Sequence, residues 1–253
     1  MRLFSATRVS TRSSILLASF GTIITTLILV PLLEVAFTVL LSADVAAPSQ
    51  ARTGYAAAIV ASSLGVCTGL VSKIVTDRNL GVFREIQFYR TVDLAYWLGS
   101  AIVPLFLSMV TGVVTVLVVF LVFDSGDWHD LGMASLLCLG ALPSGLLLGI
   151  FCSCIGVGLS DPYLGATLAG AIIPITAGVV VPTALYPQTL QVTCQFLPLT
   201  RAMKALDDFT GGTELLLALV TDWAISLAWA LLGLLILRAA VRHLKNGARK
   251  EPI

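Results

Sequence analysis

Two apolar runs and the loop between them decide the fold class: LAYWLGSAIVPLFLSMVTGVVTVLVVFLVF (residues 94–123), DSGDWHD (124–130) and LGMASLLCLGALPSGLLLGIFCSCIGVGLS (131–160). Each run has thirty residues without Lys, Arg, Asp or Glu, whereas about 20 residues let a helix cross the hydrocarbon core of a bilayer. The loop holds three acids and no Lys or Arg. The sequence therefore predicts two transmembrane helices joined by a short loop.

The composition extends this prediction to the whole chain. Of its 253 residues, 57% are hydrophobic and only 11% are charged, against about 25% charged in soluble proteins. Long charge-free runs alternate with short charged clusters. We expect one all-α integral membrane domain over residues 1–253. Six spans are predicted, at residues 19–41, 54–75, 97–123, 131–158, 163–182 and 215–237.

The basic residues predict the orientation, because cytoplasmic loops retain Lys and Arg. With six spans and both termini in the cytoplasm, twelve of the fifteen basic residues lie on the inner side. Only Arg52, Arg201 and Lys204 fall on the outer side. We therefore expect a multi-pass protein of the plasma membrane with cytoplasmic termini.

The run from Pro162 to Thr200 is too long for one span. Its 39 residues would form a helix of about 58 Å, and two full crossings would place the basic C-terminal tail outside. We expect one span ending near Val181, followed by an outer re-entrant hairpin over residues 183–212. Four prolines interrupt this region, Pro174, Pro182, Pro187 and Pro198, and proline at membrane depth is tolerated where protein or water satisfies the backbone.

Several chemistries have no support in the sequence. There is no Gly-rich phosphate loop followed by Lys and Ser or Thr, and neither of the two histidines lies within a span. Ser144 is therefore interpreted as a small packing residue, and the five scattered cysteines as buried thiols. We expect no enzyme activity, no bound cofactor or metal, and no nucleic-acid partner.

Small residues indicate close helix packing. Gly65 and Gly69, and likewise Gly145 and Gly149, are small-xxx-small pairs that let two helix backbones approach. We interpret them as packing within the chain, with a subunit interface as the alternative.

The densest charge cluster lies between the second and third predicted spans, in TDRNLGVFREIQFYRTVDLAYWLGS (residues 76–100). Val82, Phe83, Ile86 and Tyr89 recur at helical spacing, while Arg84 and Glu85 occupy other faces. This pattern predicts an amphipathic helix at the cytoplasmic surface, over residues 77–93. It either caps the bundle or docks a cytoplasmic partner.

This segment resembles the one after span two in permease subunits of type-2 ABC transporters, the exporters of drugs and polysaccharides. Asp77, Arg78, Gly81, Glu85 and Gly99 fit the pattern of that family, whereas Arg90 and Thr91 stand where the family often has Pro. A second similarity covers residues 172–200, which look like the fifth span and outer hairpin of the family. The matching positions are Pro174, Gly178, Pro182, Pro187, Leu190, Pro198, Leu199 and Thr200, with Thr189 in place of a frequent aromatic.

The resemblance implies a transport subunit without its own ATPase. Two such permeases, identical or paralogous, would pair with two ABC ATPase subunits that bind ATP and Mg. The implied ATPase-coupling residues are Arg78, Gly81, Val82, Phe83, Arg84, Glu85, Ile86 and Tyr89. Closure of the ATPases would open a pathway toward the outer hairpins, where Pro174, Gly178, Pro182, Pro187 and Pro198 are gate candidates.

Glu34 and Asp222 interrupt the first and sixth predicted spans, and charges there cost a few kcal/mol. They either pair with Arg201 or Lys204 of the hairpin, with a helix-capping role also open to Asp222, or line the exit pathway and favour cationic cargo. We expect an exporter of an amphiphilic, drug-like or antibiotic-like molecule, in keeping with a role in multidrug resistance. The alternatives are export of a lipid-linked glycan by the same architecture, and a non-transporting membrane scaffold or immunity protein.

Overall fold

The computed structural model describes residues 25, 29–44, 49–83, 93–123, 128–157, 159–207 and 213–248. Its elements in chain order are α3 (Val30–Asp44), α4 (Gln50–Asn79), α6 (Leu94–Phe123), α7 (Trp128–Gly156), α8 (Leu164–Thr176), the short 3-10 helix η3 (Thr183–Leu185), α9 (Gln188–Cys194), α10 (Thr200–Asp207) and α11 (Thr213–Ala248). No strand occurs within these residues. The prediction of an all-α chain is confirmed for them.

Four helices are long and apolar enough to cross a membrane: Gln50–Asn79, Ala95–Phe123, Trp128–Gly156 and Thr213–Arg242. They coincide with the second, third, fourth and sixth predicted spans, and they indicate a membrane protein. The predicted first and fifth spans correspond to the shorter helices α3 and α8 within the described residues. At 1.5 Å per residue, the 13 residues of α8 extend about 20 Å, so these two crossings stay predictions.

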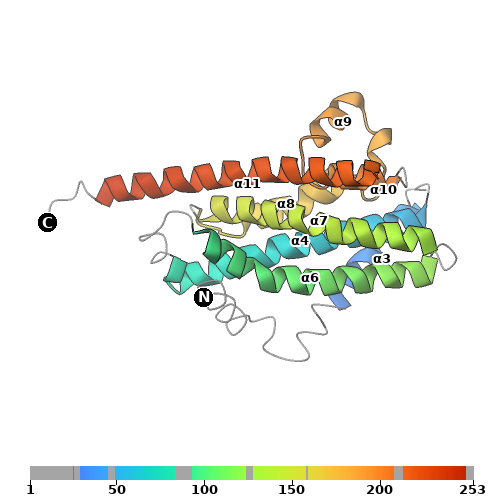
Figure 1. The fold of residues 1–253 in the computed structure, drawn as a ribbon, viewed down its shortest axis with the longest axis horizontal. Helices are drawn as coiled ribbons and strands as arrows, with labels where there is room; N and C mark the ends of the chain where they lie inside the picture. Colours follow the sequence, from blue (N-terminus) through green and yellow to red (C-terminus); the bar gives the residue numbers. More distant parts are fainter. Residues whose placement is uncertain are drawn as a thin grey trace.

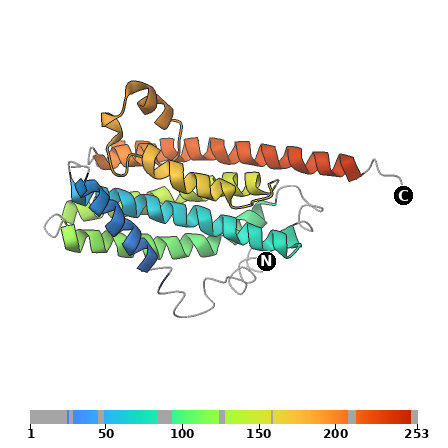
Figure 2. The same ribbon diagram turned by 180° about the vertical axis from the view of Figure 1, so that it is seen from behind.

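The long helices form a bundle with α4 and α7 at its centre, in which α6 runs antiparallel to α4, α7 and α11 (Figure 1). We name one end of the bundle the Arg52 end, where α4, α7 and α11 begin, and the other the Arg78 end, where α4 and α7 finish. Helices α6 and α3 pack against α4, and α11 packs against α7. Figure 2 shows α8 beside α4, on the face of the bundle that is turned away in Figure 1. Helix α11 projects beyond the other helices at the Arg78 end.

Helix α4 begins and ends at residues suited to those positions. Ser49 is its N-cap and accepts a hydrogen bond from the backbone N–H of Arg52 at 3.3 Å, which satisfies one of the free donors of the first turn. After Leu80, Gly81 has a φ of +78°, a conformation that favours glycine. The helix is therefore fixed in register at both ends.

Glycines allow the two central helices to touch. A Cβ on Gly145 of α7 would collide with the backbone carbonyl of Ser63 in α4, and one on Gly149 would lie 3.0 Å from Cys67 Cα. On the other face of α4, a Cβ on Gly65 would lie 2.9 Å from Ser108 Oγ of α6. The interpretation of these glycines as packing within the chain is confirmed.

Three short segments follow α8 in the region predicted as an outer hairpin. Helix α8 ends before Gly178, whose φ is +74°, and η3, α9 and α10 come next. Helix α10 packs on α11, while α9 stands away from the bundle (Figures 1 and 2). The indole N–H of Trp229 in α11 donates to the carbonyl of Phe196 at 2.8 Å, which ties the segment to that helix.

Candidate functional site

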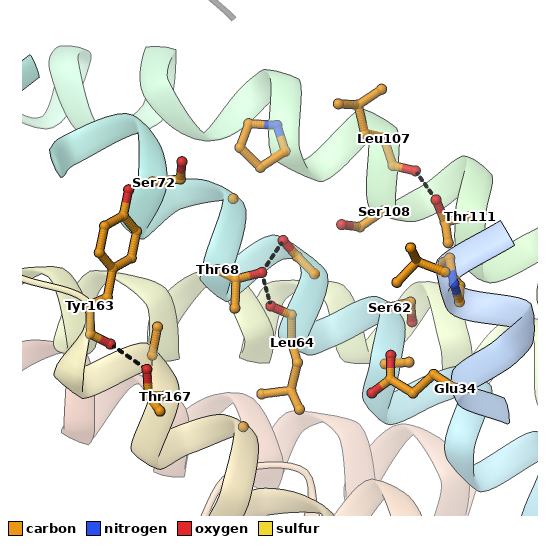
Figure 3. Close-up of a pocket in the computed structure, with 18 residues that line it drawn as sticks. Glu34, Ser62, Leu64, Thr68, Ser72, Leu107, Ser108, Thr111, Tyr163 and Thr167 are labelled. Carbon is orange, nitrogen blue, oxygen red and sulfur yellow. Dashed lines mark hydrogen bonds between the residues drawn. The ribbon is translucent and has the colours of Figure 1, made fainter. Parts of the chain in front are cut away.

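A cavity of about 570 Å³ lies between α3, α4, α6 and α8, and its volume is typical of small-molecule sites. Figure 3 shows Glu34 reaching from α3 toward Ser62 and Leu64 of α4, with Tyr163 at the other end. The lining residues are Val30, Pro31, Glu34, Ala61, Ser62, Leu64, Gly65, Thr68, Gly69, Ser72, Pro104, Leu107, Ser108, Thr111, Tyr163, Ala166, Thr167 and Gly170. The cavity is thus a half-open space bordered by helices that the sequence assigns to the membrane.

Glu34 also lines a second cavity, of about 310 Å³, which includes Pro174, Val179 and Tyr186. Ala61 is the other residue common to both cavities. Glu34 is the one charged residue among the described residues that line them, and no described Lys or Arg forms an ion pair with it. Among the described residues, the carboxyl group of Glu34 therefore has no basic partner in either cavity.

The hydroxyl groups of the larger cavity mostly donate to their own helices. Thr68 Oγ1 donates to the carbonyl of Leu64 at 2.9 Å, and Thr111 Oγ1 to that of Leu107 at 3.0 Å. Ser62 and Thr167 form equivalent bonds within α4 and α8. Because each hydroxyl has one donor and two acceptor lone pairs, these oxygens retain only acceptor capacity toward the cavity.

Asp222 has different surroundings from Glu34. It is fully buried, and its Oδ2 accepts a hydrogen bond from Ser144 Oγ of α7 at 2.5 Å. The backbone N–H groups of Leu199 and Arg201, at the start of α10, face the same carboxylate. Oδ1 forms no hydrogen bond of ordinary geometry within the described residues, so these N–H groups act on it as oriented dipoles.

Asp222 therefore holds the start of α10 against α7 and α11. Leu199 precedes α10 and has a φ of +69°, which is a strained conformation for leucine. The Asp222 carboxylate lies beside the N–H groups of this strained turn. Asp222 lines neither of the two cavities. The interpretation of Ser144 as a packing residue misses its bond to Asp222; the two residues lie 78 positions apart, and no sequence spacing links them.

Arg52 organises the end of the bundle that carries its name. Its Nη1 donates to the carbonyls of Gly178 and Val179 at 2.8 and 2.7 Å, and its Nε donates to Asp207 Oδ1 at 2.6 Å. The side chain is 8% exposed. A single guanidinium therefore joins the start of α4, the turn after α8 and the end of α10. Sequence reasoning placed Arg52 only as an outer charge.

The predicted gate residues occupy distinct places in this region. Pro174 lies within α8 and lines the smaller cavity, and Gly178 forms the turn that Arg52 holds. Pro182 and Pro187 are the N-caps of η3 and α9. Pro198 is buried directly before Leu199. These residues shape the segment but do not converge on one point.

In the same segment, Tyr186 is half-buried and Cys194 is buried. Tyr186 donates its hydroxyl to the carbonyl of Ile175 at 2.7 Å, and burial raises the pKa of Tyr186. Cys194 is 1% exposed, and burial raises the pKa of its thiol. At neutral pH both groups are therefore neutral.

At the Arg78 end, two of the predicted coupling residues make contacts within the chain. Arg78 donates to the carbonyls of Gly156 at 3.0 Å and Leu159 at 3.3 Å, which holds the turn between α7 and α8. Phe83 is buried, and its ring lies 6.1 Å from that of Tyr96.

The remaining coupling residues divide into two groups. Gly81 forms the turn after α4, and Val82 is exposed beside it. Arg84, Glu85, Ile86 and Tyr89 lie outside the described residues.

Asp77 links α4 to α6 at the same end. It is buried, pairs with Lys73 at 2.8 Å, and accepts a hydrogen bond from the hydroxyl of Tyr96 at 2.8 Å. Together with Arg78, it connects the end of α4 to α6 and to the α7–α8 turn. A displacement of the end of α4 would therefore be transmitted to α6, α7 and α8.

Within the described residues, no group of three or more His, Cys, Asp and Glu is placed to hold a metal ion. All five cysteines are buried and free. This geometry indicates a helical membrane protein with a largely apolar cavity that is lined by one carboxyl group and several hydroxyl groups. Comparison with protein families, with curated proteins and with solved structures finds no match to this chain.

Proposed function

We propose that this chain is the membrane-spanning subunit of an ATP-driven exporter of the type-2 ABC class. It would cross the plasma membrane six times with both termini in the cytoplasm, α3 and α8 contributing the first and fifth crossings. Two copies, or one copy and a paralogue, would assemble with two ATPase subunits that supply ATP and Mg chemistry. The cargo is an amphiphilic small molecule.

The observation that carries the proposal is the larger cavity. A bundle that only anchors or scaffolds gains nothing from a carboxyl group beside an open space in its membrane region, because such a group costs a few kcal/mol there. Here Glu34 and several hydroxyl oxygens line a cavity of about 570 Å³. A transport pathway for a molecule with both polar and apolar parts accounts for this lining.

The contacts of the Arg78 end support a coupling role. A partner that moves the segment after Asn79 would also move α6 through Asp77 and Tyr96, and the α7–α8 turn through Arg78. Helix α8 begins just after that turn and lines both cavities. ATPase closure would thereby change the cavity by shifting one of its walls.

The distribution of charges favours the proposed orientation. Lys73 and Arg78 lie near the Arg78 end. Arg238 and Arg242 lie toward the end of α11, on the same side, where the adjacent Leu237 and Val241 pack with Ile74 and Trp97. Because basic residues mark cytoplasmic segments, this end would face the cytoplasm. The region 183–212 would then form the outer re-entrant hairpin.

Co-purification tests the proposal. We expect the tagged chain, extracted from its own membrane, to retain an ATPase subunit in equal amount. The double charge reversal Arg84→Glu with Glu85→Arg should reduce that recovery at least fivefold, whereas Arg249→Glu, a basic residue of the tail, should leave it unchanged. A stable chain that brings down no ATPase would contradict the exporter and favour a scaffold or immunity protein.

A further inference from the structure

The charge of the cavity lining is one-sided. Glu34 lines both cavities, and no Lys, Arg or His is among the described residues that line them. Thr68 and Thr111 donate their hydroxyl hydrogens to backbone carbonyls, which leaves their oxygens as acceptors. A ligand that presents positive charge would be attracted, and one that presents negative charge would be repelled.

Most of the lining is apolar, and the cavity is large enough for more than an ion. Leu64, Pro104 and Leu107 form walls around the space, and Tyr163 presents an aromatic ring at the end far from Glu34 (Figure 3). An aromatic face attracts a cation within about 6 Å of its centre. A bare Ca²⁺ ion takes six to eight oxygens within about 2.6 Å, whereas the described lining has one carboxyl group and a mostly apolar surface.

We propose that this cavity binds a lipophilic organic monocation of drug size, with the Glu34 carboxylate as its counter-charge. The inference deepens the proposed function and rests on it where it names such cations as the exported cargo. Binding itself requires only this chain. The same lining disfavours a lipid-linked glycan, because its phosphate groups would meet Glu34 and no described lining residue is basic.

Two glycines provide a matched pair for testing the cavity. Gly170 of α8 lines the cavity, and a Cβ built there meets no atom within 4 Å. Gly132 of α7 is equally open but lines neither cavity. Leucine at position 170 would fill the cavity without a change of charge, whereas leucine at position 132 would leave it empty.

The experiment measures binding of tetraphenylphosphonium to the purified full-length chain in nanodiscs, with empty nanodiscs subtracted. Tetraphenylborate, of similar size and opposite charge, is the comparison. We expect the cation to bind and the anion not to compete for the site. Glu34→Gln should weaken cation binding at least tenfold, while Asp44→Asn, which removes a charge from the exposed end of the same helix, should change it less than twofold.

The glycine variants test location independently of charge. Gly170→Leu should weaken binding of the cation at least tenfold, and Gly132→Leu should not. Absence of cation binding, equal binding of the anion, or full binding by both Glu34→Gln and Gly170→Leu would overturn the proposal. The binding assay needs no ATPase, so it separates the two proposals. Cation binding by a chain that co-purifies with no ATPase would refute the exporter but support the binding site. Co-purification of an ATPase with a chain that binds no cation would refute the binding site alone.

Discussion

Glu34 and Asp222 are carboxyl groups in apolar helices, and their surroundings are opposite. Glu34 is exposed to two cavities and has no described ion-pair partner. Asp222 is fully buried, bonded to Ser144 and close to the N–H groups of Leu199 and Arg201 at the start of α10. The first is available to a ligand, while the second holds protein to protein.

Replacement of Ser144 tests the structural role of Asp222. We expect Ser144→Ala to lower the free energy of unfolding by about 1–3 kcal/mol, because a buried carboxylate loses a hydrogen-bond donor. Thermal unfolding in detergent measures the change. Ser108→Ala, which removes a hydroxyl from the cavity wall, is the control and should cost less than half as much. Equal losses in the two variants would contradict the role assigned to Asp222.

Arg52 gives a second prediction at this scale. Arg52→Gln removes the guanidinium that donates to Asp207 and to two carbonyls, and breaking a partly buried pair of this kind costs about 3 kcal/mol. Hydrogen exchange of residues 178–207 should accelerate, while exchange in the middle of α7 should not.

A charge swap provides the check on Arg52. The double variant Arg52→Asp with Asp207→Arg should not restore protection, because the carbonyls of Gly178 and Val179 need a donor at position 52. Recovery by the swap would show that the ion pair alone matters.

Sequence reasoning at the residue scale identified the unusual residues but not their partners. An acidic residue within an apolar run costs free energy in a membrane and therefore stands out in the sequence. Both Glu34 and Asp222 could be identified in this way. Whether each faces a cavity or another helix depends on contacts such as Ser144 with Asp222, which only the packed structure supplies. The expected pairing of Glu34 with Arg201 or Lys204 is absent from the described ion pairs.

At the scale of elements, small residues set the distance between α4 and its neighbours. Gly145 and Gly149 bring α7 onto α4, and Gly65 and Gly69 bring α6 onto the other face. Because two of these contacts are with backbone atoms, the neighbour cannot move aside as a flexible side chain would. The spacing of α4 and α7 is therefore fixed by their backbones, whereas α6, which borders the cavity, meets α4 through the side chains of Pro104 and Ser108.

Alanine substitution of α7 glycines tests this spacing. Gly145→Ala should destabilise the protein by about 3 kcal/mol, since its Cβ meets the carbonyl of Ser63 and overpacking is costly. Gly132→Ala, where the Cβ meets no atom within 4 Å, should be neutral or stabilising by up to about 1 kcal/mol. Equilibrium unfolding in detergent separates the two, and similar stabilities would contradict the packing.

The long helices could be predicted because a charge-free run and a bilayer have matching lengths. Predicted spans 54–75, 97–123 and 131–158 lie within or almost within α4, α6 and α7. The region after Pro162 was harder, since several prolines allow several breaks. The structure ends α8 at Thr176, before Val181, because Gly178 adopts a positive φ that Arg52 holds in place.

The whole molecule is polarised between its two ends. The Arg52 end carries the short segments η3, α9 and α10, and the Arg78 end carries Lys73, Arg78 and the projecting part of α11. This asymmetry predicts that α9 is reached from outside the cell and the end of α4 from the cytoplasm.

Cysteine labelling in intact cells tests the orientation. Thr189→Cys, on the exposed face of α9, should react with a membrane-impermeant maleimide from outside, and Asn79→Cys should react only after permeabilisation. The native background should be low, because Cys194 is buried and its raised pKa keeps little reactive thiolate near pH 7.5. Reaction of Asn79→Cys from outside would invert the topology.

ATP hydrolysis by the complex purified from the native membrane tests the central claim, an ATP-driven exporter with a cation site at Glu34, most directly. Tetraphenylphosphonium should stimulate hydrolysis at least twofold in the wild-type complex, and Glu34→Gln should remove the stimulation while basal hydrolysis and complex recovery persist. Hydrolysis that does not respond to the cation, or responds equally in the Glu34→Gln complex, would contradict the account.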